Sequence, residues 1–190
     1  KRAARIEQNA EAQAKVEAQR AARLEKAALD WNVGRIAALA WWTETNGTHV
    51  ALCNSEEMEA LALRHFWINT RHRTIVGYNI KGFDLKFMIQ RSRYLGIAYP
   101  QLDLGKYTLK GIIDLFSELT FNDGMYDQGC MRRTLHAFCR RFGLPVNDAI
   151  KGADIPALVE VEDWGKVTAH VTSDLELTIA LARKLGVLQP

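Results

Sequence analysis

Two polar side chains, Asn79 and Asp84, stand where a short apolar strand passes into an amphipathic helix. The stretch from Thr74 to Leu95 reads TIVGYNIKGFDLKFMIQRSRYL, and apolar residues return at helical spacing after Asp84. In α/β proteins the end of a strand is a usual place for a binding or catalytic site, because it is rigid and open to solvent. The alternative is purely structural, with Asn79 closing the turn and Asp84 capping the helix. Spacing alone leaves both interpretations open.

The elements around this stretch alternate between strands and helices. The apolar run of residues 35–42 predicts a strand buried on both faces or nearly so, Asn46-Gly47 predicts a hairpin turn, and residues 48–53 predict the returning strand. We therefore expect an α/β layer fold with a mixed sheet. The remaining predicted elements are helices over residues 55–69, 85–95, 132–142 and 164–185, a short apolar segment over 112–115, and an irregular stretch over 146–163.

The N-terminal part of the chain differs in composition from the rest. Residues 1–28 are rich in Ala, Glu, Lys, Arg and Gln and hold no Gly or Pro, which predicts one long, mostly solvated helix ahead of a core over residues 29–190. The alternative is a basic arm that touches nucleic acid. Residues 1–29 carry seven Lys/Arg and four Glu, whereas the remainder is neutral. Bulk charge therefore excludes a strongly basic nucleic-acid domain in the core.

The overall composition is typical of a soluble globular domain. The 190 residues are 48% hydrophobic and 25% charged, enough to bury one core. The longest apolar run, residues 36–42, is too short to span a bilayer, and no signal peptide is visible, so we expect no membrane association. The three cysteines form neither a CxxC pair nor a zinc spacing. Free thiols favour a cytoplasmic location.

Several segments together resemble one known family. Residues 76–84, VGYNIKGFD, resemble the second motif of the DEDD superfamily of 3′–5′ exonucleases, in which an Asn precedes an aromatic-Asp pair. The final helix, with His170, Asp174 and Thr178, is similar to the third motif, in which a Tyr lies four residues before the last Asp. Residues 135–143 and 151–154 resemble the intervening helix and loop. The resemblance covers about residues 29–188 and implies a ribonuclease-H-like mixed β-sheet flanked by helices.

The resemblance implies hydrolysis of the terminal phosphodiester at the 3′ end of nucleic acid, with single-stranded DNA expected ahead of RNA. Two divalent ions, Mg²⁺ or Mn²⁺, would activate the water and stabilise the leaving oxygen. Asp84 and Asp174 would be two of the metal ligands. His170 lies one helical turn before Asp174 on the same face and would orient or deprotonate the attacking water.

Other residues are candidates for supporting roles, each with a structural alternative. Tyr78 and Phe83 are candidates for stacking on a base, with core packing as the alternative for Phe83, and Asn79 is a third substrate-binding candidate. Asp114 is either an acid near the site or a helix cap. Four arginines of the helix over 132–142 either contact phosphates or form a solvated face; these are Arg132, Arg133, Arg140 and Arg141.

The chain departs from the family pattern in two places. His170 stands at the spacing of the family's Tyr, so a swapped base, a lost base and a structural role all stay open. The first motif, Asp-x-Glu on the first central strand, has no counterpart, because the only Asp-x-Glu begins at Asp174 inside a predicted helix. Residues 35–42 resemble the family's second strand instead. We expect the missing acids to lie upstream of Lys1; the alternative is a protein that lacks them, and two carboxylates alone should hold metal weakly.

Three functional hypotheses follow. The first is a metal-dependent 3′–5′ exonuclease, standing alone or working with a polymerase. The second is a non-catalytic nuclease-like module that binds nucleic acid or a polymerase partner. The third is an α/β domain with an unrelated role, which a large separation between Asp84 and Asp174 would favour.

Overall fold

The computed structural model describes residues 13, 15–20, 22, 26–27, 29–105, 111–121 and 134–189. Its helices are α2 (Glu56–Thr70), α3 (Asp84–Tyr94), α4 (Leu115–Leu119), α5 (Leu135–Arg141), η1 (Gly152–Asp154), α6 (Ile155–Glu160) and α7 (Trp164–Lys184). Its strands are β1 (Ala38–Thr43), β2 (Gly47–Leu52), β3 (Ile75–Gly77) and β4 (Ile112–Asp114).

The described strands form two pairs with different directions. β1 and β2 form an antiparallel hairpin in which Ala38 lies opposite Leu52 and Thr43 opposite Gly47. Gly47 has φ of 71°, a left-handed conformation that glycine adopts without strain, which explains why Asn-Gly makes this turn. β3 and β4 are parallel, with Val76 opposite Ile113. Together the pairs give the mixed strand directions of a ribonuclease-H-like α/β fold. None of these four strands carries an Asp-x-Glu pair.

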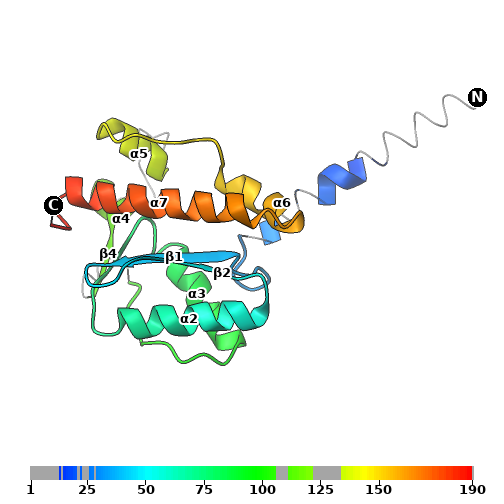
Figure 1. Cartoon of the computed structure of the whole chain (residues 1–190), viewed down its shortest axis with the longest axis horizontal. Coiled ribbons are helices and arrows are strands. Elements are labelled where there is room, and N and C mark those ends of the chain that lie inside the picture. Colours follow the sequence, from blue (N-terminus) through cyan, green and yellow to red (C-terminus); the bar gives the residue numbers. More distant parts are fainter. Residues whose placement is uncertain are drawn as a thin grey trace, which may run out of the picture.

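Helices cover both faces of the hairpin (Figure 1). α2 and α3 lie on one face, and α7 runs along the other. α5 lies on the outer side of α7, and α6 lies near the N-terminal end of α7. β1 is therefore enclosed between helical layers, as its apolar sequence predicts, although only Trp41 and Thr43 of its residues are fully buried.

Two hydrophobic clusters hold these layers together. The larger one joins the hairpin, α2, α3 and the first residues of β3 and β4, with Leu63 and Leu85 fully buried. The smaller one joins α5 and α7 to the start of α4. A buried ion pair between Glu59 of α2 and Arg91 of α3 crosses the larger cluster at 2.7 Å, and Glu59 also accepts a hydrogen bond from the Ile36 backbone N–H.

The structure confirms most predicted elements and corrects some of them. The hairpin, α2 with Ser55 as its N-cap, α3 and α7 lie where the sequence predicts them. The stretch over residues 146–163 is not irregular throughout, because η1 and α6 form there. Asp84 does not cap α3: Phe83 occupies the N-cap position, and no side chain makes a cap hydrogen bond.

The N-terminal segment is described only in part. Residues 13, 15–20, 22 and 26–27 are helical, and nearly all of them are exposed. The rest of the predicted helix over residues 1–28 lies outside the described residues. None of the helices in the described part of the chain is long and apolar enough to cross a membrane.

Candidate active site

The turn between β3 and α3 is built around Asn79. This residue adopts a left-handed conformation with φ of 52°, and its carbonyl accepts hydrogen bonds from the N–H groups of Gly82 and Phe83, both at 3.0 Å. A Cβ atom on Gly82 would lie 2.2 Å from Asn79 Oδ1, so only glycine fits there without a shift of Asn79. The predicted turn-closing role of Asn79 is therefore confirmed, and its side chain stays exposed.

Asp114 fastens this turn to the end of β4. Its side chain is buried, Oδ2 accepts the Lys81 backbone N–H at 3.0 Å, and Oδ1 accepts the Phe116 N–H at 3.1 Å as the N-cap of α4. The helix-cap interpretation of Asp114 is thus confirmed. Asp114 also places a negative charge near Asp84, so it is at once a cap and an acid beside the site.

Asp84, the first residue of α3, lies in a strongly acidic environment. It is exposed, yet crowding by protein atoms desolvates its carboxyl and, together with the negative charges of Asp114 and Asp174, raises its pKa from 3.8 to about 6. Hydrogen bonding with its own backbone N–H opposes this rise. Since a helix N-terminus by itself favours a carboxylate, the raised pKa reflects desolvation and the neighbouring acids. Asp84 and Asp174 therefore lie within electrostatic reach of each other, which disfavours the hypothesis of an unrelated domain.

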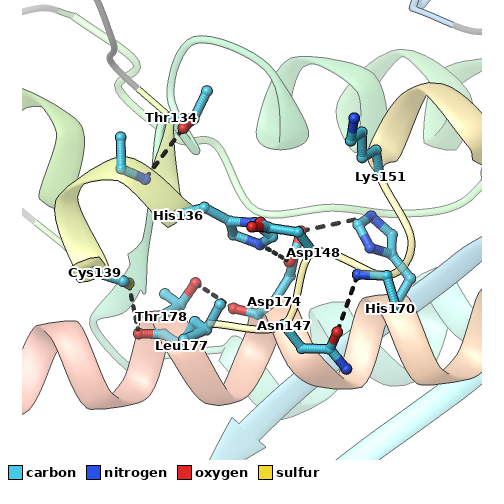
Figure 2. Close-up of polar contacts among 12 residues, drawn as sticks. Thr134, His136, Cys139, Asn147, Asp148, Lys151, His170, Asp174, Leu177 and Thr178 are labelled. Carbon is cyan, nitrogen blue, oxygen red and sulfur yellow. Dashed lines mark hydrogen bonds and ion pairs between the residues drawn. The ribbon is translucent and has the colours of Figure 1, made fainter. Parts of the chain in front are cut away.

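Asp174 on α7 lies between two histidines (Figure 2). His170 Nε2 lies 3.6 Å from Asp174 Oδ2, one turn earlier on the same helix. His136 Nε2, from α5, lies 3.1 Å from Asp174 Oδ1. The other ring nitrogen of His136 lies 2.8 Å from Asp148 Oδ1, and Arg140 pairs with Oδ2 of the same aspartate.

Sequence reasoning did not identify His136 and Asp148. The helix that carries His136 was predicted, but a single histidine on a short helix carries no spacing signal. Asp148 lies in the segment that follows that helix, and its distance from His136 depends on how the chain turns back. Nothing local in the sequence indicates that approach.

The aromatic residues of the motif pack against other rings. Tyr78 makes an edge contact with Phe116 at 5.7 Å between ring centroids and a tilted contact with Phe138 at 6.3 Å. Phe83 lies 5.7 Å from Phe87 and borders the larger core cluster. Both rings are partly buried. Of the four arginines proposed as phosphate contacts, Arg140 is engaged with Asp148, Arg141 is exposed, and the other two lie outside the described residues.

The acids of the site suit a hard divalent cation by chemistry but do not form a complete cage. Within the described residues, no group of three His, Cys, Asp or Glu side chains lies close enough to hold a metal ion. Both oxygens of Asp114 already accept backbone N–H groups. Asp84 and Asp174 are therefore the oxygen donors left for a cation among these three acids.

An α/β domain of ribonuclease-H-like type with acids at the end of its parallel strands is typical of a nuclease. The family model of the exonuclease domain of family B DNA polymerases matches residues 37–139, more than half of the chain. The chain belongs to this family, which supports a 3′–5′ exonuclease function on nucleic acid; domains of this family generally use divalent metals. The matched segment includes Asp84 and His136, whereas Asp174 follows it. Comparison with curated proteins found no match.

Proposed function

We propose that this domain removes nucleotides from the 3′ end of single-stranded DNA by metal-dependent hydrolysis. The observation that carries the proposal is the approach of Asp84 on α3 and Asp174 on α7, the acids of the two motifs, within a family of exonuclease domains. We propose that these two carboxylates hold divalent ions, Mg²⁺ or Mn²⁺. Such ions supply Lewis-acid activation of water and neutralise charge on the phosphate.

His170 is the proposed general base. Its ring is largely buried, with 14% of the side chain exposed, and its Nε2 faces Asp174 Oδ2. A carboxylate beside an imidazole orients the ring and stabilises the charge that develops when it takes a proton. His170 would take the proton of the attacking water in place of the family's Tyr. Asn79, exposed in the turn, is the favoured contact to the terminal nucleotide, because Tyr78 and Phe83 are already packed against other rings.

The second candidate is a non-catalytic module that binds nucleic acid or a polymerase partner. The observation in its favour is that β1 to β4 lack an Asp-x-Glu pair, so this chain supplies only two of the four acids expected of an active enzyme. A binding module would retain the surface without completing the metal site.

The test is degradation of 5′-labelled single-stranded DNA and of an RNA of the same sequence, with Mn²⁺, with Mg²⁺ and with EDTA. It uses this chain and a version extended upstream of Lys1. The expected result is a metal-dependent ladder that shortens from the 3′ end, faster on DNA. Asp84→Asn and Asp174→Asn should each lower the rate on the order of 100-fold or more.

Glu176→Gln is the matched control, since Glu176 is exposed on α7 two residues beyond Asp174 and points away from it. It should retain the rate. Activity in the extended version alone would show that acids outside residues 1–190 complete the site. Binding of the oligonucleotide without cleavage in both versions would contradict the enzyme and support the binding module.

A further inference from the structure

We propose that His136 is a positioning residue: it holds the carboxylate of Asp174 in the orientation that binds metal, and is itself held by Asp148 and Arg140. The inference rests on the proposed function, because it assigns Asp174 to a metal site. It adds α5 and the loop after it to the elements that build the site. Figure 2 shows the chain of contacts running from α5 to α7.

Both ring nitrogens of His136 are engaged by carboxylates. Nδ1 lies 2.8 Å from Asp148 Oδ1, and Nε2 lies 3.1 Å from Asp174 Oδ1. The side chain is only 19% exposed. An imidazole with both nitrogens occupied presents none of them to a water molecule. His136 therefore acts through Asp174 and does not compete with His170 for the role of base.

The two oxygens of Asp174 have different surroundings. Oδ1 is within hydrogen-bond distance of His136, whereas Oδ2 lies 3.6 Å from His170, too far for a good hydrogen bond. Oδ2 is therefore the atom left to bind a cation. The Asp174 side chain is 39% exposed, so without His136 it would sample other rotamers. A ligand that must be ordered when the metal arrives binds it more weakly.

Asp148 and Arg140 hold the far end of this contact chain. His136 and Arg140 lie one turn apart on α5 and contact the two different oxygens of Asp148. Asn147 Oδ1 accepts the Ala149 N–H at 3.0 Å, which orders the same loop. The loop after α5 is thus fixed against the helix by two side chains, and His136 is fixed between the loop and α7.

The position of α5 does not depend on His136. Thr134 caps the helix by accepting the Ala137 N–H at 3.2 Å, and Cys139 is fully buried against α7. The Cys139 thiol lies 3.8 Å from the Leu177 carbonyl oxygen. These contacts remain when the imidazole is replaced by a polar side chain of similar size. Variants at His136 should therefore fold.

Two substitutions separate the two contacts. In His136→Gln the amide nitrogen falls near the place of Nε2 and keeps a donor for Asp174. In His136→Asn it falls near the place of Nδ1 and keeps a donor for Asp148 alone. His65→Asn, on the exposed face of α2, is the control. The readouts are Mn²⁺ binding by calorimetry without substrate, the Mn²⁺ dependence of 3′ degradation, and Tm in EDTA, all on the version of the chain that is active.

His136→Asn should weaken Mn²⁺ binding about 10- to 100-fold, with the rate at saturating Mn²⁺ within a few-fold of wild type. His136→Gln should bind Mn²⁺ close to wild type, and Tm in EDTA should be similar in both. Equal Mn²⁺ affinity in the two variants would overturn the positioning role, as would a fall in Tm that accounts for the loss. If Asp174→Asn also left Mn²⁺ binding intact, the metal site itself would be wrong. If Asp174→Asn abolished binding while His136→Asn did not weaken it, only the role of His136 would be wrong.

Discussion

At the scale of single residues, Asp84 carries the clearest conflict between stability and function. Its pKa of about 6 in the folded chain lies above the ordinary value of 3.8. Between these values the folded state binds more protons than the unfolded state, so the free energy of unfolding falls as the pH rises through this window. Above about pH 6 the full loss is present. A site that gathers acids for a cation destabilises the fold when no cation is bound.

Asp84→Asn should therefore stabilise the protein in EDTA at neutral pH. Solvent screening of this exposed carboxyl keeps the gain below about 1 kcal/mol, so we expect a rise in Tm of roughly 2 °C at pH 7.5. The gain should shrink as the pH falls through 6 and vanish below about 4, where the carboxyl is protonated in both states. Thermal unfolding of the variant and of Glu176→Gln across this range measures it. A gain that does not change with pH would show that Asp84 is not repelled by its neighbours.

At the scale of elements, the buried pair of Glu59 and Arg91 joins α2 to α3. Arg91 donates two hydrogen bonds of 2.7 Å to the carboxylate of Glu59, which is fully buried. α3 carries Asp84 at its first residue and Arg91 two turns later. The pair therefore fixes the helix that presents one of the proposed metal ligands.

Arg91→Leu should destabilise the protein by about 3–5 kcal/mol, because it leaves the Glu59 carboxylate buried without its cation. Arg64→Leu, on the exposed face of α2, should change the stability by less than about 0.5 kcal/mol. Urea unfolding of both variants compares them. Similar losses in the two variants would mean that Glu59 finds another partner, and Arg35, 3.5 Å from it, is the candidate.

Local signals account for the elements that sequence reasoning placed correctly. Asn46-Gly47 specifies the hairpin turn, and Ser55 caps α2 by accepting the Met58 N–H, so each signal acts within a few residues. α6 was missed because a helix of six residues has little intrinsic stability and packs against α7. The same limit applies to the site. The order of motifs indicated Asp84 and Asp174, whereas the contact of His136 with Asp148 arises only after the loop folds back.

At the scale of the whole molecule, the N-terminal segment stands apart from the layers. It projects from the body beyond the N-terminal end of α7 (Figure 1). Its described residues are helical and mostly exposed, and Arg20 lies 3.8 Å from Glu160 in an exposed ion pair. Such a pair contributes less than about 1 kcal/mol. Basic and acidic residues alternate along the segment, which limits the counterions that it can displace from DNA.

Removal of residues 1–20 should therefore leave both folding and DNA binding nearly unchanged. This deletion takes away five basic and three acidic residues. We expect Tm to move by less than about 2 °C, since only the exposed pair with Glu160 is lost. The slope of log affinity against log salt for a single-stranded oligonucleotide should also stay the same, measured by fluorescence anisotropy. A slope smaller by about 1 or more would mean that the segment neutralises phosphates, and a basic arm would replace the solvated helix as its role.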